Sequence, residues 1–108
     1  MSISDEITIL YTTVSSKDEA ISIAKKIIEE NAAVCINIID NVSSFYKWND
    51  KIENSNEAII IIKTLKTTSS NIHELIKKHH SYSVPCIISF DANSHNPEYN
   101  RWLLHSNS

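Results

Sequence analysis

The chain of 108 residues contains no glycine. Loops that wrap a phosphate group with backbone amides, such as the GxxxxGKS and GxGxxG loops, need residues without a Cβ. The absence of glycine therefore excludes nucleotide-binding loops of these two kinds.

Cysteine is also scarce, because the chain has only two, Cys35 and Cys86. Two cysteines are too few for a disulfide scaffold, and these two lack CxxC spacing. Each lies in an apolar stretch. We therefore expect both to be buried small hydrophobic residues rather than reactive thiols.

Basic charge and long apolar runs are missing as well. The net charge of -3 and the pI near 5.9 provide no basic surface for nucleic acid or for a membrane. No apolar run reaches membrane-spanning length, and the N-terminus lacks the features of a secretory signal. We predict a single cytoplasmic domain over residues 1–108 without membrane insertion, although a leader segment removed earlier would leave no trace.

The central stretch, residues 33–66, predicts a long β-hairpin. Two apolar, β-branched segments flank the polar tip Trp48-Asn49-Asp50-Lys51, and Asn and Asp tolerate the positive φ of a tight turn. The second segment is apolar at every position from Ala58 to Ile62. A strand of this kind is covered on both faces. Since the chain offers only enough helix to cover one face of a small sheet, we expect an oligomer.

The remaining elements complete a βαββαβ pattern. Ser16 and Glu19 form a capping box before an amphipathic helix, and Asn71 with Glu74 marks the start of a second helix after a run of Ser and Thr. Right-handed crossovers then give a four-stranded antiparallel sheet of order 4-1-3-2 with both helices on one face. The expected class is α+β, ferredoxin-like, with these elements in chain order: strand 7–14, helix 17–30, hairpin 33–66, helix 71–80, strand 86–90 and a short helix opened by Asn96-Pro97.

Candidate chemical groups are few. His79 and His80 sit at the end of the second helix, where they either interact with its last carbonyls and dipole or turn together toward one metal ion. Glu57 opens an apolar strand and is either a general base, an oxygen ligand, or an ordinary solvated or paired carboxylate. No Ser-His-Asp or Cys-His set can be placed, so the sequence does not support an enzyme.

At this point the sequence resembles a known family, the CutA divalent-cation-tolerance proteins, over nearly the whole chain from Ile7 to Trp102. One matching piece alone would be a weak signal, but their order and spacing together are specific. The matching stretches are Ala33-Val34-Cys35-Ile36-Asn37-Ile38, Ser44-Phe45-Tyr46-Lys47-Trp48, Lys51-Ile52-Glu53, Glu57, Ile62-Lys63-Thr64, His79-His80-Ser81-Tyr82-Ser83-Val84-Pro85 and Tyr99-Asn100-Arg101-Trp102.

The resemblance implies a homotrimer, similar to the PII-type signalling proteins, with a role in divalent metal tolerance and the response to metal ions, copper included. Family copper ligands match His79 and His80, while the family's first-strand Cys matches Thr12, a poor copper ligand. Two further departures are Asn49-Asp50 in place of an acidic-Gly turn and Ser81 in place of proline.

Two functions follow as hypotheses. The first is a non-enzymatic trimer that binds copper or another divalent cation weakly through His79 and His80. The second is a signalling or anchoring module, since eukaryotic relatives are associated with anchoring a membrane enzyme. It would bind a small anion or a partner protein in clefts between subunits. The expected cleft residues are Cys35, Trp48, Glu57, Lys63 and Tyr82.

Overall fold

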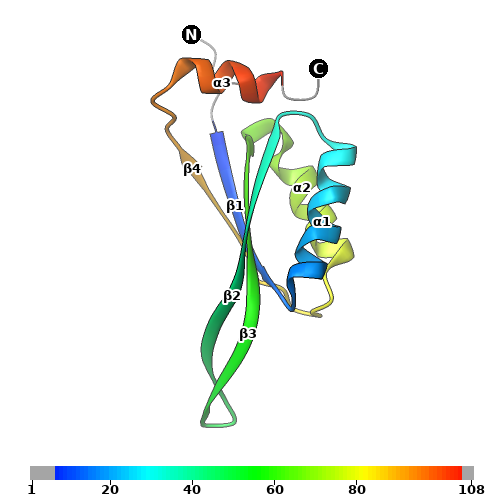
Figure 1. The fold of residues 1–108 in the computed structure, drawn as a ribbon, viewed down its shortest axis with the longest axis vertical. Helices are drawn as coiled ribbons and strands as arrows, with labels where there is room; N and C mark the ends of the chain where they lie inside the picture. Colours follow the sequence, from blue (N-terminus) through cyan, green and yellow to red (C-terminus); the bar gives the residue numbers. More distant parts are fainter. Residues whose placement is uncertain (1–6, 106–108) are drawn as a thin grey trace.

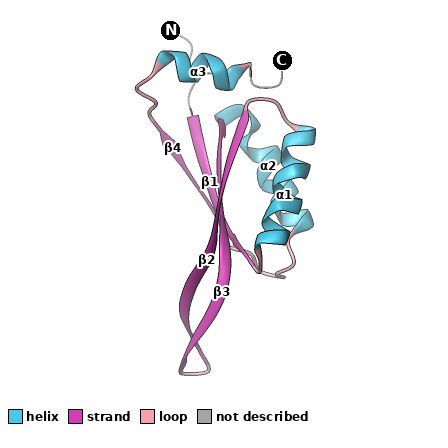
Figure 2. Ribbon diagram, viewed as in Figure 1, coloured by secondary structure: helices cyan, strands magenta, loops and turns pink. Residues whose placement is uncertain are grey.

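The computed structural model describes residues 7–105, which form a two-layer α+β fold. A four-stranded antiparallel sheet of order β2-β3-β1-β4 carries helices α1 and α2 side by side on one face (Figures 1 and 2). The predicted ferredoxin-like topology is confirmed. The elements are β1 (Ile7–Val14), α1 (Lys17–Glu30), β2 (Val34–Trp48), β3 (Lys51–Leu65), α2 (Lys66–His79), β4 (Ile87–Ala92) and α3 (Pro97–Leu104).

The hydrophobic core lies between the sheet and the two helices. From β3 it takes every second residue, Ala58, Ile60 and Ile62, each with no solvent exposure, because alternate residues of a strand point to the same face. Helices α1 and α2 contribute residues at helical spacing, among them Ile27 and Ile76. Full burial of each such side chain stabilises the fold by about 1.5–3 kcal/mol.

Helix α2 begins five residues earlier than the sequence predicted. The run of Ser and Thr was expected to separate the hairpin from a helix that begins at Asn71, but the helix starts at Lys66. The hydroxyl of Thr68 donates to the carbonyl of Leu65 at 3.0 Å, and that of Ser69 donates to the carbonyl of Lys66 at 2.8 Å. These side chains bond back to the preceding turn, so the run forms the first turn of the helix.

The central hairpin extends well beyond the helices (Figure 1). Its two-residue turn has φ of 51° at Asn49 and 63° at Asp50, the left-handed conformation that both residues tolerate. The pairing of β2 with β3 shifts register between Ile39 and Val42, and Asn41 between them has φ of 57°. This bulge lies where the hairpin leaves the helix-covered body, and such bulges increase the local twist and bend a strand.

The sheet face opposite α1 and α2 is apolar and largely uncovered in the single chain. Ile59 and Ile61 of β3 point to this face and are half-buried, while Ile88 and Phe90 of the edge strand β4 are 54% and 53% exposed. The expected cover on both faces of β3 is therefore present on one face only within residues 7–105.

The cysteines differ from their predicted burial. Both are free; Cys35 on edge strand β2 is half-buried, and Cys86, just before the opposite edge strand β4, is exposed. The prediction that Cys86 is buried was wrong, because it precedes the strand instead of lying inside it. Within residues 7–105, no helix is long and apolar enough to cross a bilayer.

Candidate functional site

The buried imidazole of His80 joins the end of α2 to strand β1. Its Nε2 lies 2.8 Å from the carbonyl oxygen of Thr13, and its Nδ1 accepts the backbone N–H of Tyr82 at 3.0 Å. The side chain has no solvent exposure. This pattern defines a neutral ring with the proton on Nε2, because Nε2 must donate to a carbonyl while Nδ1 accepts.

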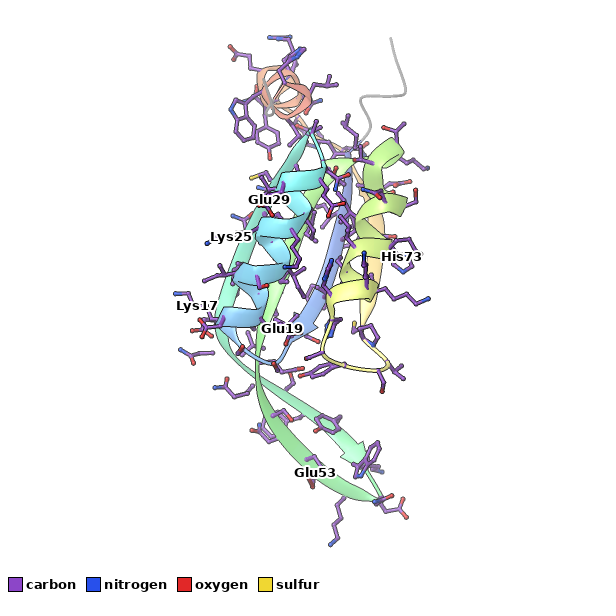
Figure 3. All side chains as sticks on the ribbon, turned by 90° about the vertical axis from the view of Figure 1, so that its right-hand side faces the viewer. Lys17, Glu19, Lys25, Glu29, Glu53 and His73 are labelled. Carbon is purple, nitrogen blue, oxygen red and sulfur yellow. The ribbon has the colours of Figure 1, made fainter. Side chains whose placement is uncertain are left out.

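The carboxylate of Glu19 ties the start of α1 to the loop after α2. Oε1 accepts the hydroxyl of Ser15 at 2.6 Å and its amide at 3.1 Å, while the hydroxyl and amide of Ser81 donate at 2.9 Å and 2.8 Å. Burial alone would raise the pKa of Glu19, but these four hydrogen bonds together lower it. Figure 3 shows Glu19 at the lower end of α1, on the side of α2 and the loop that follows it.

The capping box predicted at the start of α1 is present in modified form. The hydroxyl of Ser16 accepts the amide of Glu19 at 3.1 Å, as expected of an N-cap residue. The Glu19 carboxylate, however, reaches the amide of Ser15 and not that of Ser16. It thereby serves both the helix cap and the contact with Ser81.

Tyr82 and Glu57 form the third part of the site. The Tyr82 hydroxyl donates to Glu57 Oε2 at 2.7 Å, and its ring lies 4.9 Å from the His80 ring, centroid to centroid. Burial, followed by the hydrogen bond and the negative charge of Glu57, raises the pKa of Tyr82 to about 12. The hydroxyl therefore stays protonated at neutral pH and remains a donor to the carboxylate.

Glu57 and Tyr82 open onto a surface hollow of about 620 Å³ at the base of the hairpin. Thr13, Tyr46 and Ser55 also line it, together with the exposed residues Val84 and Cys86. The hydroxyls of Tyr46 and Ser55 lie 2.9 Å apart and share a hydrogen bond. A second hollow of about 220 Å³ also contains Glu57, beside Asp18, Asp40 and Lys17.

The structure brings together only part of the predicted cleft. Glu57 and Tyr82 meet, but Lys63 pairs across the sheet with Cys35, and its ammonium lies 5.7 Å from the ring centroid of Tyr99 in α3. Trp48 is at the exposed hairpin tip. These three residues therefore do not line the hollow of Glu57 within one chain.

The residues predicted to bind a metal ion have different roles in the structure. Thr12 is fully buried on the helix-covered face, whereas its neighbour Thr13 lines the hollow. His80 uses both ring nitrogens, and His79 is partly exposed. In the part of the chain from 7 to 105, no three His, Cys, Asp or Glu side chains are grouped to hold a metal ion. One chain alone thus does not fit a complete metal site.

Sequence reasoning missed the roles of Thr13, Ser15 and Ser81. The capping pattern identified Glu19 as a helix-start residue, but nothing local indicated that its carboxylate would bind a loop more than sixty residues away. Thr13 takes part through its backbone carbonyl, which no side-chain motif reveals.

The fold and this site define a class, an α+β ferredoxin-like domain with an extended hairpin and, at the base of the hairpin, a His-Tyr-Glu network in which the imidazole is buried. Comparison with known families matches residues 8–106 to the CutA1 divalent ion tolerance protein model. The chain belongs to this family, as the sequence resemblance predicted.

Individual relatives agree with the assignment. The divalent-cation tolerance protein CutA of Thermus thermophilus is 33% identical over 95 residues, which cover 88% of this chain and 92% of that protein. The chloroplastic CutA protein of Arabidopsis thaliana is 30% identical over 91% of this chain. The chain spans 54% of the length of that plant relative and 55% of its rice counterpart.

Solved structures of the family share the fold. The crystal structure of CutA1 from Oryza sativa superposes with a TM-score of 0.86 at 33% identity, covering 94% of each chain. The CutA1 structure from Thermus thermophilus gives a TM-score of 0.82 at 32% identity, covering 94% of this chain and 98% of that chain.

Proposed function

We propose that this protein acts in divalent metal tolerance as a non-enzymatic homotrimer that binds copper or another divalent cation weakly. Membership of the divalent ion tolerance family supports the general role. The observation that carries the oligomer is the uncovered apolar sheet face with Ile88 and Phe90. Contiguous exposed apolar surface of this kind marks an interaction site.

The trimer can be tested by substituting this face. Phe90→Lys adds a charge to the exposed face of β4 and should convert the trimer to smaller species in light scattering coupled to gel filtration. His95→Lys, in an exposed loop, is the matched control and should leave the mass unchanged. A Phe90→Lys protein that remains trimeric would exclude this face as the interface.

His79 is the proposed primary metal ligand, with further ligands supplied between subunits. Among residues 7–105, His79 makes no hydrogen bond or ion pair through its ring, whereas His80 must give up the amide of Tyr82 or the carbonyl of Thr13 to bind a metal. Losing such a buried hydrogen bond costs about 1–3 kcal/mol, which lowers affinity by about 5- to 150-fold. This cost supports weak binding when His80 takes part.

Calorimetric titration of the metal-stripped protein with Cu²⁺ and with Zn²⁺ tests this assignment. Wild type and the His95→Ala control should bind saturably, and His79→Ala should lose that binding. His80→Ala should additionally lower thermal stability, because it removes the link between α2 and β1. Binding that survives in the His79→Ala/His80→Ala double variant would refute both histidines as ligands.

A second candidate function, a signalling or anchoring module, is favoured by the hollow beside Glu57 and Tyr82. A trimer would place three such hollows near subunit boundaries, where a small molecule or a partner protein would bind. This candidate is tested by thermal-shift screening and by affinity capture. The control is a variant in which a residue lining the hollow is substituted. Absence of any ligand or partner that depends on the hollow would count against it.

The remaining assignments stay predictions. Residues 1–108 are proposed to form a single domain. The proposed cytoplasmic location is tested by cell fractionation, because relatives include chloroplastic proteins and a CutA from Archaeoglobus fulgidus that is described as periplasmic. The non-enzymatic role is tested by a hydrolase screen with Glu57→Ala as the control, since Glu57 was the sequence's only candidate base.

A further inference from the structure

The hollow beside Glu57 carries a net negative charge. Among the described residues that line it, Glu57 is the only charged one. The adjoining smaller hollow shares Glu57 and adds the carboxylates of Asp18 and Asp40 against one ammonium, that of Lys17. A concave surface lined by one sign of charge concentrates small ions of the opposite sign.

Three hydroxyl groups that line the hollow, those of Tyr46, Ser55 and Tyr82, take part in hydrogen bonds within the protein. The Tyr82 hydroxyl donates a hydrogen bond to Glu57, and its raised pKa keeps it protonated. The hydroxyls of Tyr46 and Ser55 bond to each other. An entering anion would therefore meet the Glu57 carboxylate, with no cationic side chain among the lining residues of the 7–105 range to balance its charge.

The walls of the hollow suit an organic cation better than a hydrated metal ion. Tyr46 and Tyr82 contribute aromatic rings, which attract ammonium groups through their π faces. Val84, 87% exposed, adds an apolar surface for an alkyl group. The volume of about 620 Å³ lies in the range of small-molecule sites, about 300–1,000 Å³.

We propose that this hollow binds a small organic cation, a protonated alkylamine or a quaternary ammonium ion, with Glu57 as its counter-ion. The proposal rests on the binding-module candidate and is independent of the metal proposal. It replaces the small anion that the sequence suggested as a ligand. The structural reason is that Lys63, the one cationic side chain among the expected cleft residues, lies beside Tyr99 instead of in this hollow.

The probes are n-butylammonium and tetramethylammonium, compared with neutral n-butanol and anionic butyrate. Binding is measured on the intact protein at low ionic strength by calorimetry and by the amide chemical shift of Tyr82. EDTA in the buffer removes divalent ions, so the result does not depend on metal binding. The variants are Glu57→Gln, Tyr82→Phe and the control Glu29→Gln, which removes an exposed carboxylate from α1 (Figure 3).

We expect n-butylammonium to bind wild type and Glu29→Gln equally and to bind Glu57→Gln at least about tenfold more weakly, the effect of losing one charged partner. The side-chain amide in the Glu57→Gln variant still offers an oxygen to the Tyr82 hydroxyl, so the fold should persist, as a thermal melt checks. Tyr82→Phe should retain cation binding, because Glu57 keeps its charge. A site that bound anions through the tyrosine hydroxyl would instead lose its ligand in Tyr82→Phe.

Two results would overturn the inference in distinguishable ways. Butyrate binding that matches n-butylammonium, or that strengthens in Glu57→Gln, would refute the cation and leave a binding module with an anionic ligand. If none of the four probes binds wild type, both the organic-cation proposal and the proposal that the hollow binds a small molecule are refuted. In that case the metal titration with His79→Ala still stands as a separate test.

Discussion

Replacing Glu19 by alanine should destabilise the protein far more than replacing any exposed glutamate of the same helix. The Glu19 side chain is only 14% exposed, and its carboxylate accepts four hydrogen bonds from Ser15 and Ser81. Alanine removes all four. It also disconnects the start of α1 from the loop that carries His80 and Tyr82.

The expected loss of stability in Glu19→Ala follows from the energies of these hydrogen bonds. A hydrogen bond to a charged group contributes about 1.5–3 kcal/mol net. Four donors share one carboxylate, so their contributions do not add, and water can reach the serines after truncation. We therefore expect Glu19→Ala to lower the free energy of unfolding by about 2–4 kcal/mol per chain, while Glu29→Ala stays within about 0.5 kcal/mol.

The pH dependence provides an independent test. The pKa of Glu19 in the folded protein is below its ordinary value of 4.5, so the folded state favours the charged form. This contribution to stability is complete above the unfolded pKa and is lost as the pH falls through the lower, folded pKa. The stability difference between wild type and Glu19→Gln should therefore be constant above about pH 5 and shrink below about pH 4.

Urea unfolding followed by circular dichroism at several pH values, at fixed protein concentration, measures both effects. Wild type, Glu19→Ala, Glu19→Gln and Glu29→Ala are compared. If Glu19→Ala lost less than about 0.5 kcal/mol, as surface substitutions do, the bridge between α1 and the Ser81 loop would not stabilise the fold. A stability difference that does not change with pH would show that the charge of Glu19 is unimportant.

Three further predictions concern single positions. Tyr82 should titrate near pH 12 in ultraviolet absorbance, and Glu57→Gln should move that titration toward pH 10; no movement would contradict the hydrogen bond between them. Asp50→Gly should stabilise the hairpin by about 0.5–1 kcal/mol in urea unfolding, because glycine adopts the φ of 63° without strain, and a loss of stability would refute this. Ile76→Ala should cost about 2–5 kcal/mol by the same measurement, since the side chain is fully buried, and a cost below about 1 kcal/mol would contradict its place in the core.

Much of the fold was predictable because its signals are local. The β-branched run Ile7–Val14 and the helical spacing of apolar residues in Lys17–Glu30 predicted the bounds of β1 and α1 that the structure has. Asn96-Pro97 correctly marked the start of α3. The turn at Asn49-Asp50 was predictable from the positive φ that these residues tolerate. The start of α2 was misplaced, because Ser and Thr fit both a stop and a first helical turn.

The site was predictable only in part. Tyr82 and Glu57 were named as cleft residues and do meet, but Lys63, Cys35 and Trp48 lie elsewhere. The central hairpin is long, and the register of β2 with β3 places the pair of Cys35 and Lys63 toward one end of it and Trp48 at the other, with Glu57 between them. Sequence spacing alone does not contain that register when a bulge intervenes.

The sequence by itself determined the strands, the helices, their order and the family, because each depends on neighbouring residues or on motifs in a fixed order. Only the tertiary structure decided the roles of His80 and Glu19. Both act on partners more than sixty residues away, Thr13 for His80 and Ser81 for Glu19. Whether a buried side chain binds a metal or holds the fold together depends on which groups surround it, and chain folding brings those groups together from distant parts of the sequence.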